Sequence, residues 1–330
     1  MPTPSIVNAA SSATPQSFKP ETFRSAGWCL NGHMHTICSS FFSSTEKPPV
    51  RRRRLDTPDG DFMEVDVSLQ QNDMPLVVIF HGLEGSTDRF YITQLMMELH
   101  RRNYSFVGIN FRGCGPTINR NPRFYHAGDS PELRTIFKWV IDEFGTERQI
   151  FAAGYSLGGN VLIKYLGEQG GDTPVEAAVS ISAPYDLALG SVVVGKGFNK
   201  VYQARFMRYL KAKLEAKRKT HPAEMPQFTG TTLYDFDEQI TAPLHGFASA
   251  EAYYSHSSSG QYISGVKTPL LIIHSEADPF CPVQALPVKS VRDNPFTQAH
   301  IVKRGGHVGF WSSPYGWLSS TVADFFDHMR

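Results

Sequence analysis

The segment "IFAAGYSLGGN", residues 150–160, arranges three glycines around one serine at the end of an apolar run. The apolar residues before the first glycine predict a buried strand, and the residues after the serine have helical composition. Gly154 and Gly158 stand two positions before and after Ser156. Where a strand turns sharply into a helix, side chains at those positions would collide, so glycines let the serine adopt a strained backbone with an exposed hydroxyl. This pattern predicts Ser156 as a nucleophile, and the alternative, a small residue at a bend, has to be judged from its partners.

Strands alternate with helices on both sides of this segment. Such alternation predicts an α/β fold, a doubly wound and mostly parallel sheet with right-handed crossovers. A hairpin around a Pro-Asp-Gly turn is expected at 51–69, and strands within the segments 75–82, 105–113, 150–156, 175–184, 268–280 and 297–307. Helices are expected at 87–102, 130–144, 157–168 and 316–328.

The alternation stops between residues 185 and 260, where the sequence is helical and irregular and is interrupted by prolines. We expect a core formed by residues 27–184 and 261–330, with residues 185–260 inserted as a helical cap over the carboxyl edge of the strands, where ligands bind in such sheets. Residues 1–26 lack the basic start and apolar core of a signal peptide and are rich in Ser, Pro, Thr and Ala. They are expected to be a disordered or mobile arm.

The bulk composition excludes several classes of protein. Net charge is +1, with 32 basic and 31 acidic residues among 330, so no overall field draws the chain to nucleic acid. Cys29, Cys38, Cys114 and Cys281 are far apart and form no CxxC pair, which argues against a zinc knuckle or a disulfide framework and favours a reducing compartment. No run of about 18 apolar residues predicts a membrane-spanning helix. A cytoplasmic location is expected.

A serine needs a base to take its proton and a carboxylate to orient that base. In a sheet of this kind the partners follow in the order serine, acid, histidine. Asp278 comes just after the predicted strand in "LLIIHSEADPF", and His307 lies on the glycine-rich loop "RGGHVGF" after the last strand. Both are therefore predicted at the same edge of the sheet as Ser156. Glu276 is the alternative acid, although it is nearer the end of the strand.

The other histidines have more ordinary interpretations. His274 falls within an apolar predicted strand and is expected in the core, and His300 belongs to the last predicted strand. The histidines at 126 and 245 could line a pocket or anchor loops. His33 and His35 form an HxH pair, but no third ligand is spaced to join them, so no metal site is predicted.

Acyl transfer also requires hydrogen-bond donors for the developing oxyanion. The segment "HGLEGS", residues 81–86, follows the predicted strand 75–80 directly. The backbone N–H groups of Leu83 and Leu157 are the two donors predicted. The alternative is that the loop is only a tight exit from a strand.

Several further motifs give the chain a family resemblance. It resembles the YheT-like branch of the α/β-hydrolase superfamily from about Gly27 to the C-terminus. The motifs are "NGHMHT" (31–36), "PDGDF" (58–62), "HGLEGS" (81–86), "NFRGCG" (110–115), "FYHAG" (124–128), "GYSLGGN" (154–160), "SAPYDL" (182–187), "ITAPLHGF" (240–247), "LLIIHSEADPF" (270–280) and "GGHVGF" (305–310). One departure is His35, where the branch is expected to have glutamine.

The resemblance implies a serine hydrolase of carboxylic esters, EC 3.1.1.-, acting on short- to medium-chain acyl esters or lipid esters. It places the catalytic triad on Ser156, Asp278 and His307, and it implies an acyl-enzyme and no metal or organic cofactor. Some relatives in this branch look like medium-chain ester acyltransferases. One alternative is therefore an acyltransferase that moves the acyl group from an acyl-CoA to an alcohol. A non-catalytic binding module on a hydrolase scaffold is the other.

Residues 201–219 of the predicted cap place Val201, Phe206, Leu210 and Leu214 near one helical face among lysines and arginines. This helix either has a solvated basic face or makes a peripheral contact with an anionic lipid surface. The expected partner is a small-molecule ester or lipid substrate, with no nucleic acid, and the oligomeric state stays open.

Overall fold

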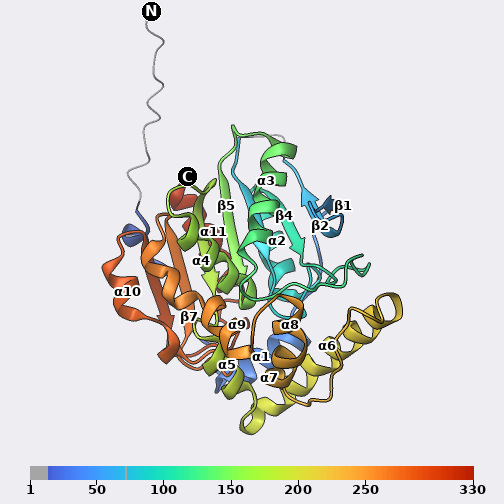
Figure 1. Ribbon diagram of the computed structural model, residues 1–330. Helices are drawn as coiled ribbons and strands as arrows, with labels where there is room; N and C mark the ends of the chain where they lie inside the picture. The colour runs from blue at the N-terminus through green and yellow to red at the C-terminus, as the bar shows by residue number, and fades with distance from the viewer. Residues whose placement is uncertain (1–13, 71–72) are drawn as a thin grey trace, which may run out of the picture.

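The computed structural model describes residues 14–70 and 73–330, and within them eight strands form a single sheet (Figure 1). The order across the sheet is β1-β2-β4-β3-β5-β6-β7-β8. β2 is antiparallel to both β1 and β4, and every other neighbouring pair is parallel. The predicted doubly wound, mostly parallel sheet is confirmed. The strands are β1 (Arg51–Asp56), β2 (Phe62–Ser68), β3 (Leu76–Phe80), β4 (Ser105–Asn110), β5 (Ile150–Tyr155), β6 (Val175–Ile181), β7 (Leu270–Ser275) and β8 (Thr297–Val302).

The helices follow the predicted alternation in the core, with ends that differ by a few residues. α2 begins three residues later than expected because residues 86–89 form a turn closed by the Arg89 N–H and the Ser86 carbonyl. The helices are α1 (Gly32–Phe42), α2 (Phe90–Arg101), α3 (Ser130–Phe144), α4 (Leu157–Gln169), α5 (Leu187–Val194), α6 (Lys200–Thr220), α7 (Leu233–Phe236), α8 (Ala242–Leu244), α9 (Ala250–Ser257), α10 (Val288–Asp293) and α11 (Trp317–Met329). Short turns of other helix types are η1 (Pro15–Ser17), η2 (Gly197–Asn199), η3 (Asp237–Thr241), η4 (Ser259–Gly265) and η5 (Val283–Ala285).

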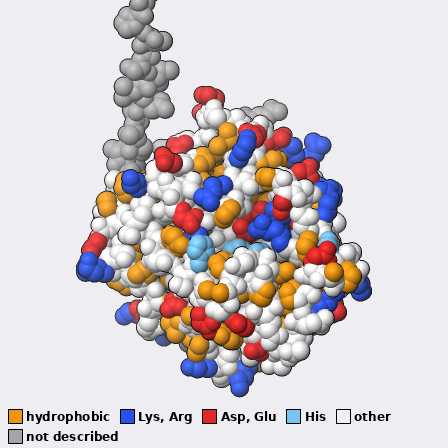
Figure 2. All heavy atoms as spheres, viewed as in Figure 1, with side chains coloured by type: hydrophobic (Ala, Val, Ile, Leu, Met, Phe, Trp, Pro, Cys, Tyr) orange, Lys and Arg blue, Asp and Glu red, His pale blue; other side chains and the backbone are white. Residues whose placement is uncertain are grey.

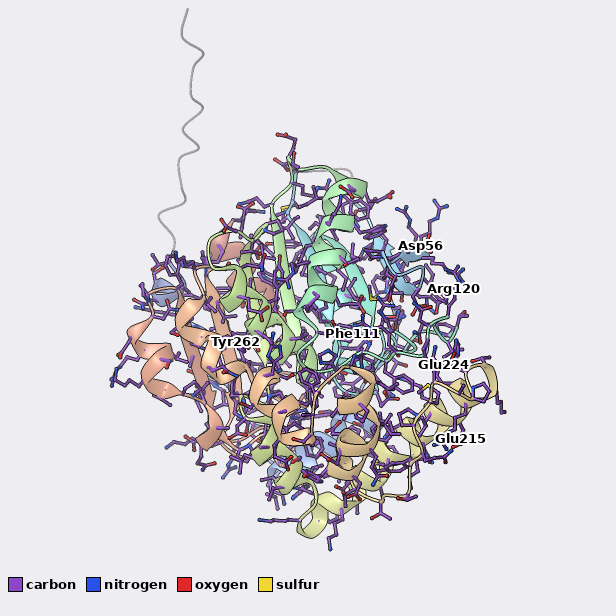
Figure 3. All side chains as sticks on the ribbon, in the orientation of Figure 1. Asp56, Phe111, Arg120, Glu215, Glu224 and Tyr262 are labelled. Carbon is purple, nitrogen blue, oxygen red and sulfur yellow. The ribbon has the colours of Figure 1, made fainter. Side chains whose placement is uncertain are left out.

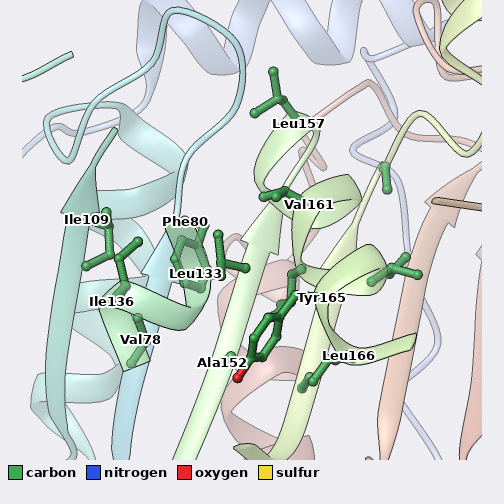
Figure 4. Close-up of a cluster of buried hydrophobic side chains, with 14 of the residues drawn as sticks. Val78, Phe80, Ile109, Leu133, Ile136, Ala152, Leu157, Val161, Tyr165 and Leu166 are labelled. Atoms are coloured by element: carbon green, nitrogen blue, oxygen red, sulfur yellow. The ribbon is translucent and has the colours of Figure 1, made fainter. Parts of the chain in front are cut away.

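Both faces of the sheet are covered, because successive side chains of a strand point to opposite sides. Val78 and Phe80 of β3 pack with α3 and α4, as the close-up in Figure 4 shows. Val77 and Ile79 face the other way, toward α2 and α11. The continuous apolar strands of the sequence therefore occupy the middle layer of three.

The order of the strands changes at β3, which lies between β4 and β5. Phe80 at the end of β3 is the register partner of Gly154 near the end of β5. The loops that follow these two strands consequently leave the sheet side by side at its carboxyl edge, where ligands bind in open α/β sheets.

Helices α5 to α9 are inserted between β6 and β7. Figure 1 shows them gathered at one end of the molecule together with α1. Met207, Leu210 and Leu214 of α6 meet Phe236 and Ile240 in a small hydrophobic cluster, which Phe124 of the segment before α3 completes. The division at residues 185 and 260 stays a prediction.

The N-terminal part of the chain contains a helix that the sequence did not reveal. The Asn31 side chain accepts a hydrogen bond from the Met34 N–H and caps α1. Residues 1–13 of the predicted arm lie outside the described residues. Residues 14–26 are packed rather than free: Phe18 is buried against Phe325, with ring centroids 5.3 Å apart, and the Trp317 indole donates to the Glu21 carbonyl.

Acidic, basic and hydrophobic side chains are mixed on the face seen in Figure 2, and no single charge dominates it. Across the described residues, we find no helix with the length and apolar character needed to cross a bilayer. The four cysteines are free thiols.

Candidate active site

Ser156 lies at the junction of β5 and α4 with a left-handed backbone, φ +53° and ψ −118°. Non-glycine residues rarely adopt a positive φ, so the surrounding structure must hold it there. A Cβ on Gly154 would lie 2.5 Å from the Gly158 carbonyl oxygen, and a Cβ on Gly158 would lie 2.6 Å from the carbonyl oxygen of His81. Only glycine fits at both positions, as the sequence indicated.

Ser156, His307 and Asp278 form an unbroken chain of hydrogen bonds. The Ser156 Oγ lies 2.7 Å from His307 Nε2, although the two residues are 151 positions apart. His307 Nδ1 lies 2.9 Å from Asp278 Oδ2. If the serine hydroxyl donates to Nε2, the imidazole proton is on Nδ1 and donates to the carboxylate. The histidine and the aspartate are both buried, so water competes little for these bonds.

Backbone groups orient the carboxylate of Asp278. The N–H groups of Phe280 and Cys281 donate to Asp278 Oδ1 at 2.8 and 3.0 Å, while Oδ2 makes the shorter of the two contacts with the imidazole, at 2.9 Å against 3.2 Å for Oδ1. Glu276, the alternative acid, is exposed at the end of β7 and is not part of this arrangement.

The loop of His307 is fixed by α1. The His307 N–H donates to Thr36 Oγ1 at 3.0 Å, and Thr36 Oγ1 itself donates to the Gly32 carbonyl. A Cβ on Gly306 would lie 2.6 Å from the Thr36 backbone nitrogen. The glycines of "RGGH" therefore allow α1 to pack directly against the histidine loop.

The loop after β3 lies against Ser156. A Cβ on Gly82 would lie 3.0 Å from the Cβ of Ser156 and 3.5 Å from its Oγ. The N–H of Gly82 donates to Tyr91 OH and that of Glu84 to Tyr125 OH, so two tyrosines fix the peptides on each side of Leu83.

Leu83 and Leu157, the predicted oxyanion donors, have N–H groups that reach no acceptor within residues 14–70 and 73–330. Leu157 is the first residue of α4, where the helix dipole is positive. Both N–H groups are therefore available to a bound oxygen atom next to Ser156.

His81 fixes the start of this loop through two hydrogen bonds. Its Nδ1 donates to the Gly82 carbonyl at 2.7 Å, and its Nε2 accepts from the Phe111 N–H at 3.2 Å. Complete burial lowers the pKa of His81 to about 3, so the ring stays neutral and keeps both bonds at any physiological pH.

The remaining predicted histidines have structural partners. His274 Nε2 donates to the Cys281 carbonyl, and His300 packs on Trp317. His35 accepts from the Trp311 N–H, while His33 contacts Tyr202.

The rings of His126 and His245 pack at a tilt of 49°, with centroids 4.3 Å apart, and burial lowers the pKa of each to about 3. They line a cavity of about 40 Å³ that Leu83 and Leu157 also line.

Among the described residues, only Asp278, Cys281 and His307 bring three ligand-type atoms together, within 4.8 Å of one another. The His307 Nδ1 already donates to Asp278. Burial raises the pKa of the Cys281 thiol well above its usual value, which keeps the sulfur protonated and a poor ligand. These residues do not fit a metal.

The Ser156 hydroxyl opens into a cavity of about 380 Å³ that lies between α1 and α6. The walls are largely apolar and aromatic, which suits a hydrocarbon chain. Ile37, Phe41, Tyr91, Phe206, Phe280 and Val308 are among the residues that line it.

Several positioning residues were not identified from the sequence. Thr36, Tyr91 and Tyr125 act through contacts between distant segments, for which no local pattern exists. Asn160 accepts from the Ser259 N–H and donates to the Ala127 and Ser257 carbonyls, which ties the helix after Ser156 to the inserted segment. The only available signal was its place in the "GYSLGGN" motif.

Comparisons with known proteins agree with this architecture. Residues 75–314 match the family model described as alpha/beta hydrolase fold. The esterase Pf2001 from Pyrococcus furiosus has a similar structure, with a TM-score of 0.58 and 18% identity over 84% of this chain and 92% of that one.

Curated relatives cover most of the chain. YheT of Escherichia coli (strain K12) is 36% identical over 89% of this chain and 90% of that protein. The human protein named phospholipase ABHD3 is 27% identical over 88% of this chain and 74% of its own length. The Saccharomyces cerevisiae protein named monoacylglycerol lipase is 28% identical over 79% of this chain and 61% of its own length.

Proposed function

This chain belongs to the α/β-hydrolase family, within its YheT-like branch, and is a carboxylic ester hydrolase; we propose that it works through an acyl-enzyme formed on Ser156. His307 is the general base and Asp278 orients it. The backbone N–H groups of Leu83 and Leu157 hold the oxyanion. The observation that carries this proposal is the unbroken hydrogen-bonded chain from serine to carboxylate at the end of an apolar cavity.

The first half of the reaction uses each of these groups once. His307 Nε2 takes the Ser156 proton as Oγ attacks the ester carbonyl, and the resulting oxyanion accepts hydrogen bonds from the two leucine N–H groups. The imidazolium is stabilised by Asp278 and returns its proton to the departing alcohol. An ester then links the acyl group to Ser156.

Water completes the cycle by the same steps in reverse. His307 removes a proton from water, the hydroxide attacks the acyl carbonyl, and the proton passes to Ser156 Oγ as the carboxylic acid leaves. Atoms and charge balance with this chain's own residues, so the mechanism requires no cofactor.

The cavity suggests the class of acyl group. Its aromatic and aliphatic walls favour a hydrocarbon chain, and its volume of about 380 Å³ suits short to medium acyl chains. Two relatives are named as a monoacylglycerol lipase and a phospholipase, so lipid esters fall within the proposal. We further propose that residues 185–260 act as a cap that selects the substrate, because α6 supplies Tyr202, Phe206 and Tyr209 to the cavity wall.

A chemical probe tests the nucleophile directly. A fluorophosphonate should label the wild-type protein and Ser255→Ala, a control at an exposed serine of α9, but not Ser156→Ala. Hydrolysis of p-nitrophenyl esters from acetate to decanoate should show the same dependence on Ser156 and reveal the preferred chain length. Labelling of Ser156→Ala as strong as that of wild type would refute the assignment.

A further inference from the structure

Large hydrophobic side chains are exposed around the mouth of the catalytic cavity. Thirteen such side chains are exposed among the described residues, and six of them lie on α1, on the residues just before it, on η2 and on the start of α6. We call these six residues the apolar rim: Trp28, Leu30, Phe41, Phe42, Phe198 and Val201. Phe41 and Phe42 are adjacent and are 72% and 73% exposed. Exposed apolar patches of this kind usually mark an interaction site.

The two helices that carry the rim are in contact. His33 of α1 lies 3.2 Å from Tyr202 OH and stacks on the Tyr202 ring, and its own ring lies 4.9 Å from that of Phe198. Phe41 and Val201 both line the cavity that holds Ser156. The two parts of the rim, on α1 and at α6, therefore meet at the entrance of this cavity.

Further aromatic side chains pack next to the rim, beside α1. Trp28 packs on Trp311 at 5.2 Å, and Trp311 packs on Tyr315 at 4.9 Å. The Tyr315 hydroxyl is hydrogen-bonded to Ser43, just after α1, and the ring is 49% exposed. Tryptophan and tyrosine are the side chains that settle at the boundary between hydrocarbon and water.

Basic side chains adjoin the rim, whereas the two acidic side chains that line the cavity mouth, Asp88 and Glu84, are each paired with a lysine. Residues 196–211 contain five exposed basic residues and no acidic residue, and none of the five has an acidic partner among the described residues: Lys196, Lys200, Arg205, Arg208 and Lys211. Residues 26–44 contain no acidic residue either. The first acid of α6 is Glu215, which Figure 3 shows toward the outer end of that helix.

We propose that α1 and the first half of α6 dock this protein on an anionic lipid surface, with the cavity mouth facing the lipid. Apolar side chains flanked by unpaired cations bind such a surface through buried hydrocarbon area and through attraction to anionic head groups. In a symmetric dimer formed through this surface, the five cations of one copy would face the same five cations of the other. Their repulsion disfavours such a dimer. Docking is independent of the proposed hydrolysis, because no residue of the rim belongs to the Ser156, His307 and Asp278 chain.

Sedimentation of sucrose-loaded vesicles tests the docking in a Ser156→Ala background, where no hydrolysis alters the lipid. Full-length protein should bind vesicles of phosphatidylcholine with about 30 mol% phosphatidylglycerol and bind pure phosphatidylcholine far less. Phe42→Ser should weaken binding about tenfold, because a phenylalanine is withdrawn from hydrocarbon. Lys196→Glu and Lys200→Glu should each weaken it at least fivefold.

The control is Leu69→Ser, which removes an exposed leucine after β2, at the opposite edge of the sheet. In the Ser156 wild-type background, Phe42→Ser should hydrolyse a soluble p-nitrophenyl ester at the normal rate. Equal loss of vesicle binding in Phe42→Ser and Leu69→Ser would overturn the proposal, as would equal binding to neutral and anionic vesicles. So would a dimer that depends on Phe42 and does not bind vesicles. Absence of ester hydrolysis with normal vesicle binding would refute the proposed function and leave the docking intact.

Discussion

Replacing Lys213 with methionine should destabilise the protein and slow catalysis together. Lys213 of α6 donates to Glu84 Oε1 at 2.7 Å, and the two side chains are only 10% and 6% exposed. Glu84 follows Leu83 in the loop that lies against Ser156, and it has a left-handed backbone with φ +50°. Its carboxylate also accepts from Tyr125 OH at 2.9 Å. The ion pair therefore joins the inserted helices to the proposed oxyanion loop.

The size of the effect follows from the buried charge that remains. Removing one partner of a buried ion pair costs about 3–5 kcal/mol, because the other charge is left without compensation in a poorly solvating site. Removing both charges in Glu84→Gln with Lys213→Met should restore most of that loss, since an amide is less costly to bury. We expect the double variant to be about 2–3 kcal/mol more stable than the sum of the single changes predicts.

Urea unfolding of the four proteins in this cycle measures the free energies, and p-nitrophenyl butyrate hydrolysis measures kcat. Lys213→Met should lower kcat about tenfold or more, because Glu84, whose ion pair is lost, follows Leu83, the proposed oxyanion donor. The matched control is Lys211→Met on the same helix, which removes an exposed lysine and should change neither quantity. If Lys213→Met unfolds at the wild-type urea concentration, or if the single effects simply add, the ion pair does not hold the loop.

Asp278→Asn should lower kcat about 10⁴-fold in p-nitrophenyl ester assays with little change in stability, since an amide permits the wrong imidazole tautomer. Gly158→Ala should abolish both hydrolysis and fluorophosphonate labelling and lower the melting temperature, because its Cβ would lie 2.6 Å from the carbonyl oxygens of Phe80 and His81. Burial raises the pKa of the Asp237 carboxyl from 3.8 to about 6. The folded protein holds that proton more tightly than the unfolded chain, so the stability from this group is present below pH 4 and is lost as the pH rises through 6. Asp237→Asn should therefore show a flatter free energy of unfolding between pH 4 and 6 in urea titrations.

Much of the arrangement around Ser156 could be predicted because its parts follow one rule. Ser156, Asp278 and the oxyanion loop each come directly after an apolar strand, and His307 lies on the loop after the last strand. The carboxyl ends of parallel strands meet at one edge of the sheet, so local sequence and strand order are enough to bring these loops together. The roles that we assign to them stay predictions until the variants are measured.

The residues that hold those loops in place could not be found in this way. Thr36 contacts the His307 loop across 271 positions of sequence, and Lys213 contacts Glu84 across 129. Each contact depends on where a helix packs after the chain has folded, and a threonine or a lysine occurs on most helices. The sequence offered more indication of a role for His81, since a histidine at the end of a buried strand needs hydrogen-bond partners. The alternative, that residues 81–86 only form a tight turn out of the strand, explained this histidine equally well.

The helix α6 shows why a single apolar stripe was an incomplete description. The sequence placed Val201, Phe206, Leu210 and Leu214 on one face, yet Val201 is 59% exposed. The buried face is made by Met207, Leu210, Leu214 and Lys217, at spacings of three and four residues, and it ends in a lysine whose ammonium donates to backbone carbonyls. A second set, at 202, 206 and 209, has the same spacing and faces the catalytic cavity instead. One face of α6 packs in a hydrophobic core and another lines the cavity that holds Ser156, while Val201 in its first turn stays exposed at the entrance. This helix therefore connects the rim to the catalytic cavity.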